Sequence, residues 1–280
     1  MIKIINTNFL QTNISGINHN ASVFFKSVKF RNLTLSDFNN HNSLTFSNCE
    51  GLPNSIIEIK DSDLGDTKLN DFSFKSFSEI RIDYSLLNNI LTSNIEWFDD
   101  NQLKFENGST IKTLRNKREI YSQLKNASLK QGNAIQSLEF RAREMKTYRE
   151  ELKKSDKYTI GDKLIMAVSR SNSHGLNWLK PVTIIFFLTI ITFVILVLCV
   201  SERITIKPSC SKEDWVLTIN ELYYYSNAFP QLFNPVRRLS DLFPTEKLNF
   251  MVYLFDTLHR IILSIFIFQA VIAFRKFFNK

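Results

Sequence analysis

Hydrophobic positions recur every five residues through much of the first hundred residues of the chain. The clearest examples are Val28, Leu33 and Phe38, followed later by Leu64, Leu69 and Phe74. A five-residue period matches neither an α-helix nor a single β-strand. It fits a coil of square cross-section, in which each face takes one five-residue unit and stacked coils bury a continuous core. The pattern predicts a β-solenoid over residues 1–109, with an irregular sandwich of short strands as the alternative.

The pattern becomes helical after residue 110. Residues 112–130 and 134–154 each carry apolar side chains on one face, and Gly132 and Asn133 between them form a stop-and-turn signal. We therefore expect an antiparallel helical hairpin, followed by a third helix at residues 160–170. Together these helices form a predicted basic linker domain over residues 110–177.

An uncharged run at residues 182–200 predicts a membrane-spanning helix, since about 20 apolar residues cross the hydrocarbon core. A second predicted span covers residues 248–274, although only its last part is strongly apolar. The mean hydropathy of −0.11 indicates that the membrane part is a minority of the chain. We therefore predict a multi-domain β + α membrane protein, with a two-helix transmembrane domain at residues 178–280 and spans at about 181–201 and 248–274.

The segment between the spans contains its own pattern. Residues 215–225 predict a short amphipathic helix, and Pro230 and Pro235 then predict extended backbone. Two-span channels have this order of elements, with a re-entrant segment that lines the pore. The alternative is a helix on the membrane surface, with Tyr223, Tyr224 and Tyr225 among the lipid headgroups.

Basic residues gather in front of the first predicted span. Residues 111–181 contain 16 Lys and Arg against 7 Asp and Glu, whereas residues 1–110 contain 9 against 13. Lys180 precedes the first span, and Arg275 and Lys276 follow the second. The positive-inside tendency therefore predicts that both termini are cytoplasmic, and the start of the chain lacks the features of a signal peptide.

The sequence contains no pattern typical of an enzyme. It lacks a Gly-rich phosphate loop, a His-Glu-x-x-His motif and a Gly-x-Ser-x-Gly motif, and its four histidines are far apart. Cys49, Cys199 and Cys210 have neither metal-ligand spacing nor the even number of a disulfide framework. We expect no catalysis, no cofactor and no metal site.

Residues 63–74 (Asp-Leu-Gly-Asp-Thr-Lys-Leu-Asn-Asp-Phe-Ser-Phe) resemble a pentapeptide-repeat protein, which implies a right-handed β-helix. The basic helix at residues 141–154, the segment at 173–181 (Ser-His-Gly-Leu-Asn-Trp-Leu-Lys-Pro) and the following span resemble bacterial pentapeptide-repeat membrane proteins. Some of those proteins are similar to two-span potassium channels. The resemblance implies a bacterial inner (cell) membrane. Residues 225–231 contain no glycine, which excludes a potassium filter of the Thr-Val-Gly-Tyr-Gly type.

The first functional hypothesis is a gated ion channel. Two spans cannot enclose water, so conduction requires a homo-oligomer, which we expect to contain four copies in membrane lipid. Polar side chains inside a span point to function, although they also occur at the membrane interface. Asp256 and Arg260 are four residues apart and could pair on one helix face. The pore-lining candidates are Tyr225, Asn227, Gln231, Asp256, His259, Arg260 and Gln269.

The basic linker suggests an anionic gating signal, such as a nucleotide, an oligonucleotide or single-stranded DNA. The candidate ligand-binding residues are Arg115, Lys117, Arg118, Tyr121, Phe140, Arg141 and Arg143, with the two aromatic rings available for stacking on bases. Ordinary solvation of these charges is the alternative. The architecture resembles that of membrane effectors in bacterial anti-phage defence. The second functional hypothesis is a membrane-anchored scaffold, which offers the solenoid wall to protein partners without conduction.

Overall fold

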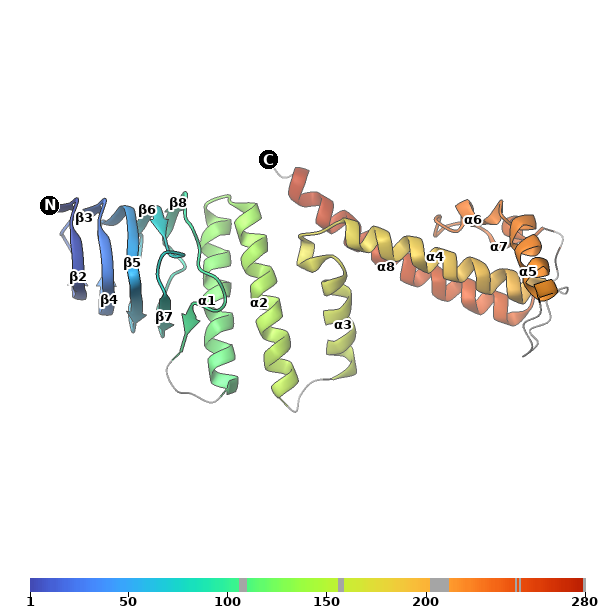
Figure 1. Ribbon diagram of the computed structural model, residues 1–280, viewed down its shortest axis with the longest axis horizontal. Helices are drawn as coiled ribbons and strands as arrows, with labels where there is room; N and C mark the ends of the chain where they lie inside the picture. Colours follow the sequence, from blue (N-terminus) through green and yellow to red (C-terminus); the bar gives the residue numbers. More distant parts are fainter. Residues whose placement is uncertain (106–109, 156–158, 202–211, 245, 247, 279–280) are drawn as a thin grey trace. The chain divides into compact units, whose positions relative to one another are not determined.

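The computed structural model describes all residues except 106–109, 156–158, 202–211, 245, 247 and 279–280. The chain forms two compact units, Met1–Thr159 and Ile160–Lys280. Figure 1 colours them along the chain, from blue at the N-terminus to red at the C-terminus. Each unit has its own hydrophobic core.

Unit 1 begins with a β-solenoid of about four turns. Its strands are β1 (Ile2–Ile5), β2 (Asn8–Asn18), β3 (Val23–Lys26), β4 (Lys29–Asn40), β5 (Leu44–Lys60), β6 (Lys68–Ser73), β7 (Glu79–Asp83), β8 (Leu91–Ser93) and β9 (Leu103–Lys104). Every strand pairs in parallel with the strand one coil away, as Val23 with Leu44 and Lys68 with Leu91. These pairs are 21 and 23 residues apart, so four five-residue units complete about one coil. The parallel pairing confirms the predicted solenoid and excludes the sandwich.

Two corners of the solenoid use left-handed backbone at equivalent positions of successive coils. One corner has a positive φ at Asn6, Ser27, Asn48, Asp71 and Asn94. The other has a positive φ at Gly16, Asp37, Asp61 and Tyr84. Asn and Asp tolerate this conformation because their short polar side chains hydrogen-bond locally. Asn94 donates to the Asp71 carboxylate at 2.6 Å, which joins two neighbouring corners and gives the abundant Asn and Asp residues a structural role.

Aromatic rings from successive coils fill the solenoid. Phe25 stacks on Phe46 with a centroid distance of 4.9 Å, and Phe74 stacks on Trp97 at 5.2 Å. Buried polar groups also repeat, since the amide of Asn18 donates to Asn40. The predicted five-residue spacing therefore arises from inward-facing positions on successive faces, all belonging to one core.

The helical hairpin closes the C-terminal end of this core. It consists of α1 (Thr110–Lys130) and α2 (Ala134–Lys154), which lie side by side in Figure 1. The Gln123 carboxamide accepts from the Leu87 backbone at 2.6 Å, and Gln131 accepts from the Thr92 backbone and donates to the Ile90 carbonyl. Tyr121 belongs to the solenoid core. The predicted boundary at residue 110 therefore does not divide two units, because the last coil buries its open end against the hairpin.

Unit 2 contains the remaining helices. They are α3 (Ile160–Ser171), the 3₁₀ turn η1 (Ser173–Gly175), α4 (Leu179–Val200), α5 (Lys212–Tyr224), α6 (Ala228–Gln231), α7 (Leu239–Leu242) and α8 (Phe250–Phe278). The third helix of the predicted linker, α3, therefore belongs to unit 2. The predicted short helix between the spans corresponds to α5.

α4 and α8 pack along each other and are both long and apolar enough to cross a membrane (Figure 1). Only 28% of the most apolar stretch of α4 and 22% of that of α8 is buried within the protein. A core helix of a soluble protein would be mostly buried, so these outward apolar faces indicate contact with lipid. The chain is a membrane-associated protein with two candidate spans, close to the predicted ranges.

The predicted extended backbone around Pro230 is wrong. Pro230 lies inside the short helix α6, and Asn227 before it already has helical dihedral angles. Proline fits the first turn of a helix because the amide it lacks has no partner there. The segment after α5 is therefore a series of short helical turns, which pack against the ends of α4 and α8 through Leu232, Leu242 and Phe243.

Candidate functional site

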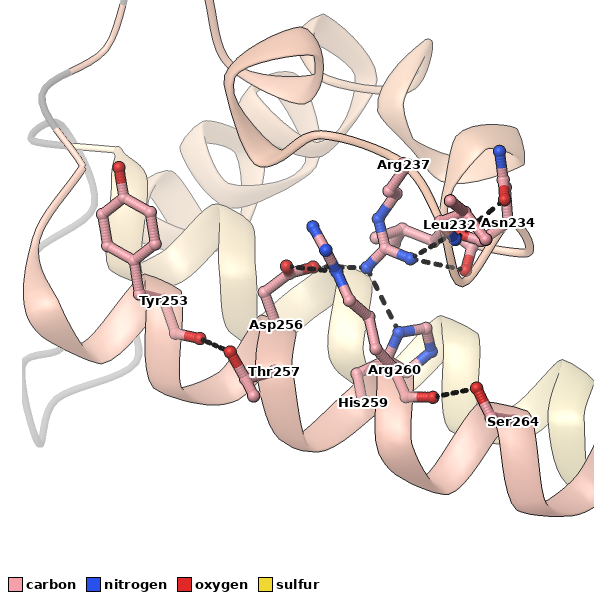
Figure 2. Close-up of polar contacts among 10 residues, drawn as sticks. Leu232, Asn234, Arg237, Tyr253, Asp256, Thr257, His259, Arg260 and Ser264 are labelled. Atoms are coloured by element: carbon pink, nitrogen blue, oxygen red, sulfur yellow. Dashed lines mark hydrogen bonds and ion pairs between the residues drawn. The ribbon is translucent and has the colours of Figure 1, made fainter.

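A charged cluster of Arg237, Asp256, His259 and Arg260 lies where the connecting segment meets α8 (Figure 2). Arg237 comes from the turn between α6 and α7, and the other three residues come from the first turns of α8. Arg237, Asp256 and His259 are 6%, 3% and 2% exposed. Such burial of charged groups requires pairing, because an isolated charge strongly prefers water.

Arg237 makes most of the contacts in the charged cluster. Its Nη2 donates to Oδ1 of Asp256, and its Nη1 donates to the carbonyl oxygens of Leu232 at 3.1 Å and Asn234 at 2.9 Å (Figure 2). Hydrogen bonds to two carbonyls hold the turn in shape, while the ion pair ties it to α8. Arg237 therefore connects the segment between the spans to the second span.

Asp256 is shared by two guanidinium groups. Nε of Arg260 lies 2.8 Å from Oδ2 of Asp256, one helical turn away, and Arg237 occupies the other oxygen. The charged cluster thus contains two permanent positive charges and one carboxylate. The excess positive charge falls on Arg260, whose side chain is 31% exposed.

His259 completes the charged cluster. Its Nδ1 lies 3.3 Å from Nη2 of Arg237. A guanidinium group can only donate, so in this contact Nδ1 accepts and the imidazole proton lies on Nε2. Nε2 of His259 is buried and has no hydrogen-bond partner within the described part of the chain. The Nε2–H group of this imidazole is therefore free to donate a hydrogen bond.

A polar stripe runs along the outer face of α8 beside this charged cluster. Tyr253, Thr257, Arg260 and Ser264 form it, spaced at intervals of three or four residues. At 100° per residue these positions fall within about 60° of one another around the helix. Tyr253 is 53% exposed, and Thr257 and Ser264 are also exposed. The hydroxyls of Thr257 and Ser264 bond carbonyls one turn back, which leaves their oxygens facing outward.

The pore candidates chosen from the sequence lie in three places. Asp256, His259 and Arg260 come together in the charged cluster. Gln269 is on the opposite side of α8 from the polar stripe and accepts from the amide of Asn172 at 2.8 Å. Gln269 therefore has a partner within unit 2.

The three candidates in the connecting segment do not join the charged cluster. Asn227 and Gln231 are exposed, and Gln231 donates to the Asn227 carbonyl at 3.3 Å. The hydroxyl of Tyr225 donates to Glu246 at 2.8 Å. Burial, followed by this hydrogen bond and the charge of Glu246, raises the pKa of Tyr225. Tyr225 is therefore a neutral hydrogen-bond donor.

Sequence reasoning missed Arg237. The signal available was an acidic residue in a span, Asp256, which requires a positive partner. Arg238 is the neighbouring alternative in the sequence, and it is exposed. Only the turn geometry distinguishes the two.

The basic candidates in unit 1 mostly serve its own structure. Nε of Arg115 lies 2.9 Å and Nη1 of Arg118 lies 3.2 Å from the two oxygens of Glu151. Lys117 lies 3.8 Å from Asp100, and Arg143 donates to the Phe98 carbonyl at 2.7 Å. These contacts join the two helices or fix them to the last coil. Arg141 is exposed.

The two aromatic candidates require a correction. Tyr121 and Phe140 are both 0% exposed and stack with a centroid distance of 6.4 Å. Their rings close the solenoid core, so in this fold they present no face to a nucleic-acid base. Their helical spacing therefore reflects packing against the last coil.

Comparison of the chain with family models, curated proteins and solved structures gives no match. The resemblance to pentapeptide-repeat membrane proteins and to anti-phage effectors thus has no support from relatives. No group of three or more His, Cys, Asp and Glu suited to a metal ion occurs among the described residues.

Proposed function

We propose that the protein is a homo-oligomeric membrane channel in which the polar stripe of α8 faces a central aqueous path. The polar stripe carries this proposal. Ionisable and polar residues within spans almost always face a bundle interior or water, because hydrocarbon does not solvate them. Most other exposed residues of the two spans are apolar.

Assembly follows from the shape of unit 2. One α4–α8 pair cannot surround water, so several copies must contribute α8 to a common axis; we propose four. The outward apolar residues on the other faces of α4 and α8 then contact lipid. In this arrangement Thr257, Arg260 and Ser264 line the path, whereas Asp256 and His259 lie behind them.

The charged cluster also suggests the sign of the permeant ion. Each copy contributes two guanidinium groups and one carboxylate, and Arg260 is the member that is partly exposed. Rings of Arg favour anions in pores. We therefore propose that the channel prefers anions, with Asp256 positioning Arg260 through the 2.8 Å contact.

The second part of the proposal concerns the signal. We propose that unit 1 is cytoplasmic in a bacterial inner membrane and binds an anionic ligand through basic residues of α1 and α2. The side chain of Arg115 is 66% exposed and Arg141 is exposed, so both can reach a ligand. Binding affects conduction only if the ligand prefers the open or the closed state.

The test of conduction uses purified full-length protein in a planar bilayer with a salt gradient. We expect discrete conductance steps and a reversal potential with the sign of the equilibrium potential of the anion. Arg260→Gln should move the reversal potential toward zero, because each copy loses the exposed positive charge. Arg238→Gln, in the exposed turn, is the matched control and should leave it unchanged. A silent bilayer, or a strict monomer by mass photometry, would contradict the channel.

The test of the signal uses single-stranded DNA as the probe. Its affinity should fall linearly on a plot of log affinity against log salt concentration, because binding releases counterions. Arg115→Ala combined with Arg141→Ala should weaken binding and flatten the slope. Unchanged binding in this variant would exclude these residues as the ligand site.

A membrane-anchored scaffold is the second candidate, and the solenoid itself favours it. Stacked coils present an extended wall, which suits protein partners. A partner recovered by cross-linking to unit 1, together with a silent bilayer, would support the scaffold. Discrete conductance that is lost in a stripe variant would contradict it.

A further inference from the structure

An apolar groove of about 600 Å³ lies between α3, α4 and α8 of unit 2. Its apolar lining comes from Ala167, Val168, Leu179, Ile184 and Phe266. Arg170, Ser171, Asn177, Lys180 and Thr183 supply the polar lining. The volume is within the range of about 300–1,000 Å³ typical of small-molecule sites. We refer to this feature as the lipid groove.

We propose that the lipid groove binds one anionic phospholipid, with an acyl chain against its apolar lining and the phosphate between Arg170 and Lys180. This proposal does not depend on conduction or on the number of subunits.

The charges in the lipid groove favour an anion. Arg170 and Lys180 are both exposed, and no acidic residue is among the described residues that line the groove. Nζ of Lys180, itself a lining residue, donates to the Ser173 hydroxyl at 2.7 Å, which leaves further protons of the ammonium group for a phosphate. Basic pockets between membrane helices commonly bind anionic headgroups.

The depth of the lipid groove suits a phospholipid. Trp178, between two of its lining residues, stacks on Phe274 with a centroid distance of 4.9 Å. Trp is enriched at the level of lipid headgroups, so Trp178 indicates that the groove opens at the membrane interface.

The helix that forms one wall of the lipid groove is itself amphipathic. Ile160, Leu164 and Ile165 of α3 are 75%, 63% and 66% exposed, and Met166 is its one buried residue. A short helix with an uncovered apolar face next to a span is typical of a helix lying in the membrane interface. Lipid in the groove would continue the apolar surface of α3 onto α4 and α8.

The test measures quenching of Trp178 fluorescence by brominated lipids. The full chain carrying Trp97→Phe and Trp215→Phe keeps Trp178 as its single tryptophan. It is placed in vesicles of phosphatidylcholine that contain a few per cent of brominated phosphatidylglycerol or of brominated phosphatidylcholine. We expect the anionic lipid to quench strongly and the zwitterionic lipid to quench only in proportion to its amount.

Arg170→Gln with Lys180→Gln should reduce the preference for phosphatidylglycerol by roughly 30-fold, as expected for two basic residues near a membrane surface. Lys163→Gln with Arg275→Gln is the matched control, since it also removes two positive charges of unit 2 but neither residue lines the groove. An equal loss in the control would show diffuse attraction to the surface and would overturn the proposal.

Ala167→Phe tests the acyl chain separately, because it fills the apolar lining without changing charge. It should weaken quenching by brominated phosphatidylglycerol at least severalfold, and unchanged quenching would show that the acyl chain does not lie in the groove.

Equal quenching by both lipids in the parent protein would also overturn the proposal, as expected if another copy of the protein fills the groove. Inorganic phosphate should not displace the lipid, and displacement would point to a free anion instead. Size-exclusion profiles matching that of the parent confirm that each variant is folded.

Discussion

The two units use the same kind of ion pair, but the arginines lie in different environments. In unit 1, the buried carboxylate of Glu151 receives Arg115 and Arg118, whose side chains are 66% and 35% exposed. In unit 2, Asp256 receives Arg237 and Arg260, and Arg237 and Asp256 are almost completely buried. Water can solvate Arg115 and Arg118 when the Glu151 carboxylate is lost, whereas the buried Arg237 has no such replacement for Asp256.

The difference extends to how each unit is held together. Unit 1 repeats its contacts from coil to coil, through stacked rings, left-handed corners and buried Asn side chains. Unit 2 holds the turn between α6 and α7 against α8 through one small apolar cluster and the buried ion pair of Arg237 with Asp256. A single substitution should therefore have the largest effect where the contact is both buried and unrepeated.

The largest effect is expected for Asp256→Asn. Removing one member of a buried ion pair costs about 3–5 kcal/mol, because the remaining charge stays buried without compensation. Amide hydrogen exchange in detergent should accelerate by more than 100-fold in the turns between α6 and α7. Glu151→Gln is the matched control in unit 1. It should change the free energy of opening that exchange reports in α1 and α2 by about 1 kcal/mol or less. Similar effects at both sites would remove the contrast between the units.

An intermediate effect is expected for Gly65→Ala in the solenoid. Gly65 has a φ of +48°, and an added Cβ would lie 2.2 Å from the Asn40 carbonyl oxygen of the neighbouring coil. Left-handed strain of about 1–2 kcal/mol and overpacking of about 1–3 kcal/mol should add. Gly132→Ala is the control, since its φ of +74° brings the strain but no atom within 4 Å. Amide hydrogen exchange should show a larger loss of stability near β6 in Gly65→Ala than near the α1–α2 turn in Gly132→Ala. Equal losses of stability would mean that neighbouring coils separate easily.

The smallest effect concerns acid pH and Asp100. Burial alone would raise the pKa of this carboxyl, but the Tyr121 hydroxyl and the charges of Lys117 and Lys146 outweigh it and hold the pKa below its ordinary value. A lowered pKa contributes stability above pH 4 that is lost as the pH falls through the folded-state value. Asp100→Asn should reduce, by about 0.5–1 kcal/mol, the stability that unit 1 loses between pH 7 and pH 3. Urea unfolding at the two pH values measures this loss. Identical losses in parent and variant would contradict the lowered pKa of Asp100.

The solenoid and the spans were predictable because their patterns are local. The spacing of Val28, Leu33 and Phe38 and the apolar run at residues 182–200 depend on neighbours along the chain. The repeating corner residues, such as Asn48 and Asp71, were also visible in the sequence once the coil length was known. The turns around Pro230 were mispredicted because proline is compatible with both extended backbone and a first helical turn.

The sequence by itself determined the two environments of this protein, a coiled β-structure and two helices apolar enough for lipid. Only the tertiary structure decided which polar residues meet: Arg237 and not Arg238 pairs with Asp256, and Tyr121 enters the solenoid core instead of facing a ligand. Hydrophobic periodicity is set within a few residues of the chain. The pairing of Arg237 with Asp256 joins segments 19 residues apart, and the burial of Tyr121 depends on the last coil of the solenoid, so both exist only after the units have folded.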